Sequence, residues 1–203
     1  MEFTVLGGKG AAFAPNLLSA ASHTLSRELR VIRIGTSVFD EKHGDDLLGF
    51  LSSESVVTLP RNLEKDQVLS YMVQELAAKG LLPTHLVPRI TSDLIRREQS
   101  GTTGLGNGLA LPHLKRPELT AFMGLIGVAT EGIDFNSLDG RPVRIVILIL
   151  SPSNQTNLHL EILGRIAKLC SDRTLQYSTQ LARSPDLLLR FLGIGTKGVD
   201  RDE

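Results

Sequence analysis

Apolar residues recur at the three-to-four-residue spacing of an amphipathic helix in two neighbouring stretches, residues 63–79 and 86–98. The positions that share an apolar face are Val68, Met72 and Leu76 in the first stretch, and Ile90 and Leu94 in the second. Gly80 follows the first stretch as a C-terminal stop, and Pro88 suits the first turn of the second. The pattern therefore predicts two consecutive helices, with the second ending near residues 97–98.

Two later stretches, residues 121–129 and 143–150, are strand-like. The second contains the unbroken apolar run Ile145–Leu150, which is typical of a strand covered on both faces. Asp139–Gly140 predicts a turn between them. Further helices are expected over residues 158–170, 172–182 and 185–192. Helices before, between and after strands predict a layered α/β domain.

The 203 residues are enough for one domain with appendages. Residues 1–45 show no sustained period, so we expect a flexible or partly ordered extension there. The domain itself is expected over residues 46–193, and residues 194–203 form a C-terminal tail.

Bulk charge excludes some classes of partner. Lysine plus arginine equals aspartate plus glutamate, 22 each, so no nucleic acid or anionic membrane is indicated.

Cys170 is the only cysteine, which allows no internal disulfide and no cysteine-based metal site and fits a reducing compartment. The apolar run is far shorter than the ~20 residues of a membrane helix, and the N-terminus does not resemble a signal peptide. We therefore expect a cytoplasmic protein without membrane insertion.

A glycine-rich segment, residues 101–108, separates the second helix from a short apolar strand that stops at His113. The segment lacks the lysine and hydroxyl residue of a phosphate-binding P-loop. It also fails the dinucleotide pattern G-x-G-x-x-G, because counting from Gly104 the sixth position is Leu109. Glycine content alone is equally typical of a tight helix-to-strand connection.

Three side chains could together transfer a phosphoryl group, although each has an ordinary structural explanation. His113 could be a surface residue, Arg97 could simply end its helix, and His159, on the apolar face of its predicted helix, could be a satisfied core residue. Together they offer a neutral imidazole nucleophile, a cation to balance the phosphoryl charge, and a second imidazole N–H to hold an oxygen.

The segment "REQSGTTGLGNGLALPH" closely resembles the active-site segment of enzyme IIA domains of the bacterial phosphoenolpyruvate:sugar phosphotransferase system, fructose–mannitol type, which includes nitrogen-regulatory IIA proteins. That segment typically has the pattern R-E-x-x-G-S-T-G-I-G-N-G-x-A-x-P-H. The matching residues are Arg97, Glu98, Gly101, Thr103, Gly104, Gly106, Asn107, Gly108, Ala110, Pro112 and His113. Thr102 and Leu105 replace the usual serine and isoleucine. Weaker resemblance to the same domain extends over residues 46–193.

The resemblance implies a fold and a set of roles. The implied fold is a mixed β-sheet flanked by helices on both faces. His113 would be phosphorylated through its ring Nε2, His159 would hydrogen-bond the phosphoryl group, and Arg97 would balance its charge. The residues that would shape the phosphate loop are Gly104, Gly106, Asn107 and Gly108. No metal or cofactor is implied.

The resemblance also implies partners, and it leaves the physiological role open. The donor would be a phosphohistidine on the small carrier protein HPr or a relative. The protein would then be either a nitrogen-regulatory-type switch acting on a target protein, which an unfused domain favours, or a sugar-uptake component that passes the phosphoryl group to a IIB partner. A degenerate IIA fold that only binds proteins is a third alternative, which the presence of all three site residues disfavours.

Overall fold

The apolar run predicted as a buried strand lies at the centre of a six-stranded mixed sheet. The computed structural model describes residues 47–171, 182–192 and 194. This strand is β6, Val143–Pro152. Its antiparallel neighbour β5, Met123–Ile133, runs four residues beyond its predicted end and has a register irregularity between Val128 and Ile133. Gly132 lies in that irregularity with a φ of +84°, which favours glycine. The turn predicted at Asp139–Gly140 lies between the two strands.

Short strands extend the sheet on both sides. β1, Val56–Thr58, pairs parallel with β5. On the other side of β6, β3 (Leu109–Ala110) and β4 (His113–Arg116) pair parallel with successive parts of the same edge. β2, Gly104–Gly106, pairs antiparallel with β3 and completes the strand order β1-β5-β6-β3-β2.

The glycine-rich segment is more ordered than the plain connection considered from the sequence. β2 and β3 form a hairpin whose turn residues, Asn107 and Gly108, have φ values of +53° and +80°. Positive φ at both central residues is the requirement of a type I′ turn, for which Asn-Gly is a favoured pair. His113 also differs from the expectation of a loop residue past a strand end, because it is the first residue of β4.

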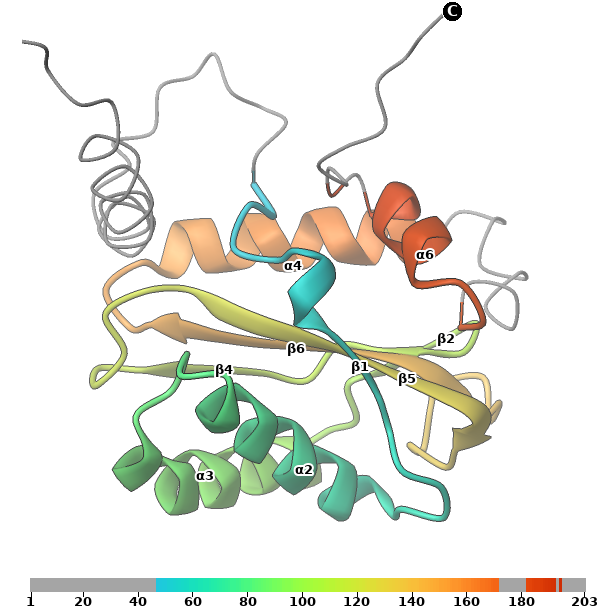
Figure 1. Ribbon diagram of the computed structural model, residues 1–203, viewed down its shortest axis with the longest axis horizontal. Helices are drawn as coiled ribbons and strands as arrows, with labels where there is room; N and C mark the ends of the chain where they lie inside the picture. The colour runs from blue at the N-terminus through green and yellow to red at the C-terminus, as the bar shows by residue number, and fades with distance from the viewer. Residues whose placement is uncertain (1–46, 172–181, 193, 195–203) are drawn as a thin grey trace, which may run out of the picture. The chain divides into compact units, whose positions relative to one another are not determined.

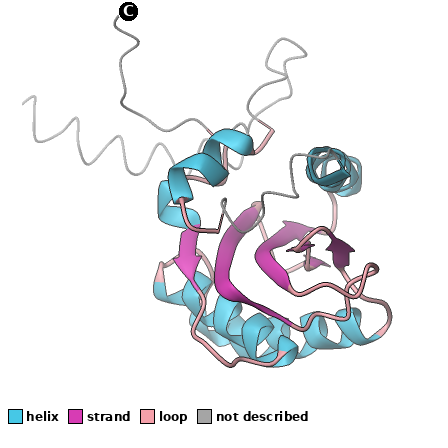
Figure 2. Ribbon diagram, turned by 90° about the vertical axis from the view of Figure 1, so that its right-hand side faces the viewer, coloured by secondary structure: helices cyan, strands magenta, loops and turns pink. Residues whose placement is uncertain are grey.

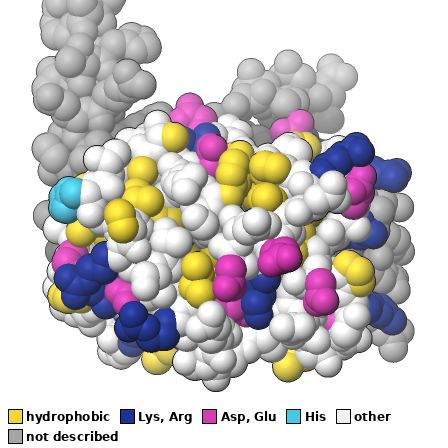
Figure 3. All heavy atoms as spheres, turned by 90° about the horizontal axis from the view of Figure 1, so that it is seen from below, with side chains coloured by type: hydrophobic (Ala, Val, Ile, Leu, Met, Phe, Trp, Pro, Cys, Tyr) yellow, Lys and Arg dark blue, Asp and Glu magenta, His cyan; other side chains and the backbone are white. Residues whose placement is uncertain are grey.

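Two helices cover one face of the sheet. α2, Lys65–Ala78, and α3, Val87–Gln99, lie within two residues of their predicted bounds. α2 ends where predicted because Gly80, at a φ of +72°, lets Leu81 N–H donate to Leu76 O and Gly80 N–H to Ala77 O. The outer face of this helix pair carries interspersed acidic and basic side chains with separate hydrophobic groups between them (Figure 3).

The other face is covered by α4, Thr156–Ser171, and α6, Pro185–Phe191. α6 lies within the helix predicted at residues 185–192, and Ser184 caps it by accepting from Leu187 N–H. Figures 1 and 2 show the sheet between the two helical layers from two sides. The predicted mixed sheet with helices on both faces is confirmed. Three predicted parts lie outside the described residues: the extension 1–45, the helix at 172–182 and the tail after residue 194. The exception is Ala182, which is in a turn.

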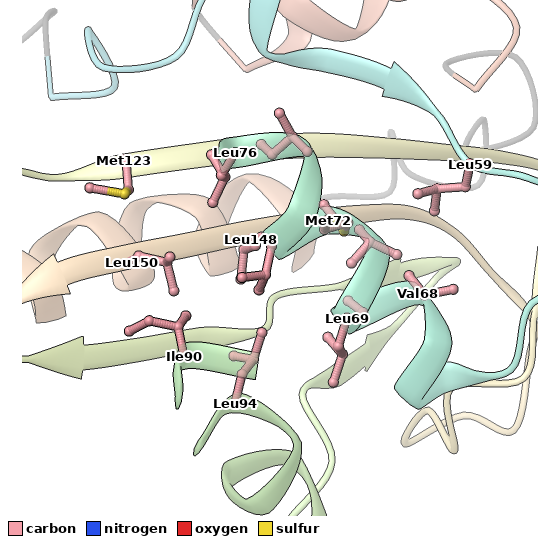
Figure 4. Close-up of a cluster of buried hydrophobic side chains, with 14 of the residues drawn as sticks. Leu59, Val68, Leu69, Met72, Leu76, Ile90, Leu94, Met123, Leu148 and Leu150 are labelled. Carbon is pink, nitrogen blue, oxygen red and sulfur yellow. The ribbon is translucent and has the colours of Figure 1, made fainter. Parts of the chain in front are cut away.

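The alternation of β6 divides the core into two layers. Ile145, Ile147 and Ile149 belong to the cluster that includes Ile162 and Ile166 of α4. The intervening positions Val146, Leu148 and Leu150 belong to the cluster on the side of α2 and α3, part of which Figure 4 shows. Both layers are fully buried along β6, which explains why its sequence has no polar alternation.

Candidate functional site

His113 is positioned by a break between two strands. β3 and β4 share one edge of β6, and Leu111 and Pro112 separate them; the Pro112 carbonyl oxygen accepts from Ile149 N–H at 3.0 Å. The half-buried His113 ring turns back onto its own chain, with Nδ1 2.8 Å from Leu111 O. A carbonyl oxygen can only accept, so this contact assigns the proton to Nδ1 and leaves the lone pair on Nε2.

Arg97 lies next to that lone pair. It belongs to the last turn of α3, and its Nη2 is 3.3 Å from His113 Nε2. A guanidinium is always protonated and only donates, so this contact agrees with the same tautomer of His113. Arg97 Nη1 also donates to Gly101 O at 3.0 Å, which holds the side chain in place at the start of the glycine segment. The sequence-predicted pair is therefore brought together.

His159 completes the group from the opposite side of the sheet edge. It lies in the first turn of α4, is 2% exposed, and its ring centroid is 5.5 Å from that of His113, in an edge-to-face arrangement. Its helical neighbours Ile162 and Ile166 are buried, as the predicted apolar face required. Its Nδ1 is 2.7 Å from the hydroxyl of Ser151, a residue that the sequence analysis missed. The sequence feature that could have pointed to Ser151 is a single hydroxyl residue directly after the apolar run Ile145–Leu150.

The surroundings keep both imidazoles neutral near neutral pH. Burial is the main cause that lowers the pKa of His159 to about 4, and electrostatic repulsion from His113 and Lys115 contributes to that value in the same direction. Burial also lowers the pKa of His113; the Leu111 hydrogen bond opposes this effect, and the Arg97 charge adds to it. Lys115, two residues along β4 from His113, is a second cation at the site that the sequence analysis left without a role.

A buried carboxylate ties α3 to the glycine segment. Glu98 is 2% exposed and accepts from the Thr103 N–H at 3.0 Å and from the Thr103 hydroxyl at 2.6 Å. Lys65 at the start of α2 places its Nζ 3.5 Å from the same carboxylate. These contacts account for two matched motif residues to which the sequence analysis gave no role. Because Arg97 is adjacent to Glu98, the same network restrains the backbone that carries the guanidinium.

The four residues predicted to shape a phosphate loop are in contact with segment 137–145. Ser137 Cα would lie 2.8 Å from a Cβ on Gly104, and Asp139 Cγ 3.2 Å from one on Gly106. Asn107 N–H donates to Asp139 at 2.8 Å, and Gly108 O accepts from Arg144 and Ile145. The register places Leu109, which follows the hairpin tip, four strand residues from His113, or about 13 Å. A phosphate-loop role for these residues stays a prediction, and their contacts support a role in shaping the hairpin.

Known proteins share this arrangement of motif and fold. Residues 49–193 match the family model of the phosphoenolpyruvate-dependent sugar phosphotransferase system, EIIA 2. The chain belongs to this family. It is thus a phosphotransferase-system component at the family level, and the resemblance to enzyme IIA domains of this type is confirmed.

Relatives within this EIIA family include regulatory and sugar-specific proteins. A nitrogen regulatory protein of Bradyrhizobium diazoefficiens is 37% identical over 123 residues, 60% of this chain and 80% of that protein. A fructose-specific EIIABC component of Bacillus subtilis is 30% identical over 129 residues, 64% of this chain and 20% of that protein.

Solved structures of the family have the same fold. The nitrogen regulatory protein IIA-Ntr of Neisseria meningitidis aligns with a TM-score of 0.62 at 26% identity, covering 71% of this chain and 97% of that one. IIA mannitol of Escherichia coli aligns with a TM-score of 0.57 at 20% identity, covering 70% and 98%. Across the described parts of the chain, no helix has the length and apolar character needed to cross a membrane.

Proposed function

We propose that this chain is a phosphohistidine carrier in which Nε2 of His113 accepts a phosphoryl group from an HPr-like phosphocarrier. The observation that carries the proposal is the pairing of His113 with Leu111 O through Nδ1, which leaves the Nε2 lone pair 3.3 Å from Arg97 Nη2. A lone pair beside a fixed cation is what an incoming phosphoryl group with its negative oxygens requires.

The transfer step balances without a proton leaving the site. The Nε2 lone pair of His113 attacks the phosphorus, and the P–N bond to the donor histidine breaks. The donor imidazole leaves with that bonding pair as a neutral ring, while the new phospho-imidazolium of His113 keeps its Nδ1–H on Leu111 O. Arg97 balances the charge of the transferring group, and the protein contributes mainly positioning.

The product is suited to a regulatory role. Phosphorylation adds roughly two negative charges to a half-buried site, so a partner could bind one form and reject the other. A nitrogen regulatory relative is 37% identical to this chain and a fructose-specific one 30% identical, which supports a nitrogen-regulatory-type switch with a target protein. A cytoplasmic location, where such a donor would meet it, belongs to the same proposal.

A second candidate role is favoured by the sugar-specific relative. In that role the phosphoryl group passes from His113 to a IIB component, as the fructose-specific EIIABC relationship suggests. Incubating the phosphorylated protein with a purified fructose-type IIB domain distinguishes the two roles. Rapid loss of the phosphoryl group to IIB supports uptake, and retention supports regulation.

The deciding experiment follows intact mass after mixing the protein with phosphoenolpyruvate, enzyme I and HPr. We expect the wild type and His85→Ala, a control for an exposed histidine, to gain one acid-labile, alkali-stable phosphoryl group. His113→Ala should gain none while remaining folded, with a change in unfolding free energy of about 1 kcal/mol or less. A folded His113→Ala that still takes the group would refute the assignment. So would a wild type that takes none from HPr or from its nitrogen-type relative.

A further inference from the structure

Ser151 is a buried hydroxyl in a row of apolar side chains. It follows Ile145, Ile147 and Ile149 at alternate positions of β6, on the face covered by α4, and is 0% exposed. A hydroxyl buried there without a hydrogen-bond partner would destabilise the fold. Its partner among the described residues is Nδ1 of His159, 2.7 Å away. The serine therefore serves the second histidine and not the core.

The direction of this hydrogen bond is decided by the other ring nitrogen. A neutral imidazole carries one proton, and a serine hydroxyl can donate or accept. His159 is neutral near neutral pH, so one nitrogen donates and the other accepts. With Nδ1 engaged by Ser151, Nε2 is the nitrogen available to a group on the neighbouring His113 ring. Phosphoryl oxygens only accept, so Nε2 must hold the proton if it is to bind one.

We propose that Ser151 is a positioning residue: its hydroxyl donates to His159 Nδ1 and so holds that ring in the Nε2–H tautomer, ready to donate to a phosphoryl oxygen on His113. This inference rests on the proposed function of His113. The same bond also fixes the orientation of the His159 ring, because it joins the first turn of α4 to β6.

The two histidines are thereby set in complementary ways. On His113 a backbone carbonyl accepts a hydrogen bond from Nδ1–H, so Nε2 keeps a free lone pair, as a nucleophile needs. On His159 a hydroxyl donates a hydrogen bond to the unprotonated Nδ1, so the ring proton stays on Nε2, as a donor needs. One pair of Nδ1 contacts thus gives two identical side chains opposite roles.

The test compares Ser151→Ala with the conservative Ser151→Thr, which keeps a hydroxyl, and with Ser55→Ala, a buried serine near β1 as control. Long-range proton–nitrogen NMR spectra report the His159 tautomer. We expect Nε2–H in the wild type, in Ser151→Thr and in Ser55→Ala, and a mixture of tautomers in Ser151→Ala. Phosphotransfer by Ser151→Ala should be roughly five- to tenfold slower, as for loss of about one hydrogen bond. Ser151→Thr should restore it.

The outcomes separate this inference from the proposed function. A wild-type Nδ1–H tautomer, or a Ser151→Ala protein with wild-type tautomer and rate, overturns the role of Ser151 while phosphorylation of the wild type still stands. A Ser151→Ala protein that is only less stable also overturns it, since packing alone leaves the tautomer unchanged. Failure of the wild type to gain a phosphoryl group overturns the carrier function, and the mass spectrum shows this independently of the NMR result.

Discussion

Gly104 is the position where the packing of the hairpin against segment 134–142 is tested most directly. A Cβ added there would lie 2.8 Å from Ser137 Cα and 3.1 Å from Ser137 Cβ. The neighbouring backbone is held in place, because Leu138 N–H donates to Gly104 O at 3.1 Å and the Ser137 hydroxyl donates to Arg141 O at 2.6 Å. Gly104→Ala therefore pushes the new Cβ against the Ser137 backbone, which no rotamer change can relieve.

The magnitude follows from that distance. Carbon–carbon contacts are most favourable at about 3.5–4.0 Å, so the contact must open by roughly 0.7 Å or more. Overpacking of this kind costs about 1–3 kcal/mol. Replacing glycine by alanine regains about 0.4–1 kcal/mol by restricting the unfolded chain. We expect Gly104→Ala to lower the free energy of unfolding by about 1–2 kcal/mol.

Urea denaturation followed by circular dichroism measures this loss. Gly101→Ala is the matched control, because a Cβ there meets nothing within 4 Å and the same unfolded-state gain applies. We expect Gly101→Ala to be equal to or slightly more stable than the wild type. Equal stability of the two variants would refute the packing argument. If Gly104→Ala keeps full stability but loses phosphotransfer, Gly104 acts at the phosphoryl group and not in packing. That result would support the phosphate-loop prediction.

Two further predictions concern buried charge. The pKa of His159 falls from 6.5 to about 4 on folding, so between these pH values the unfolded chain binds a proton that the folded chain does not. The unfolding free energy should therefore decrease by up to about 3 kcal/mol as the pH falls through this window. An NMR titration of the folded protein in which His159 has its midpoint near pH 6.5 would contradict this. Glu98→Gln, which breaks the buried pair with Lys65, should cost about 3 kcal/mol in urea denaturation, whereas Glu131→Gln in an exposed pair should cost less than about 1 kcal/mol. Equal losses would show that the burial of Glu98 is unimportant.

Local pattern determined much of the fold from the sequence alone. The helical spacing at 63–79 and 86–98 and the apolar run of β6 predicted elements within a few residues, because periodicity and end signals act between near neighbours. The motif from Arg97 to His113 indicated the family because its residues are also close together in the sequence. The Asn107–Gly108 pair is also a sequence signal for a hairpin turn. It was missed because the glycines were considered together as a loop.

The tertiary structure decided which nitrogens of the two imidazole rings have hydrogen-bond partners. Nothing near His159 in the sequence indicates that Ser151 will meet its Nδ1, because that contact depends on how α4 docks on β6. The burial of Glu98 against Lys65, and the contact of Gly104 with Ser137, likewise depend on which helix or loop covers them. Residue types determined the candidate chemistry, but hydrogen-bond direction, burial and pKa arise from partners distant in the chain, and only strand register and helix packing bring those partners together.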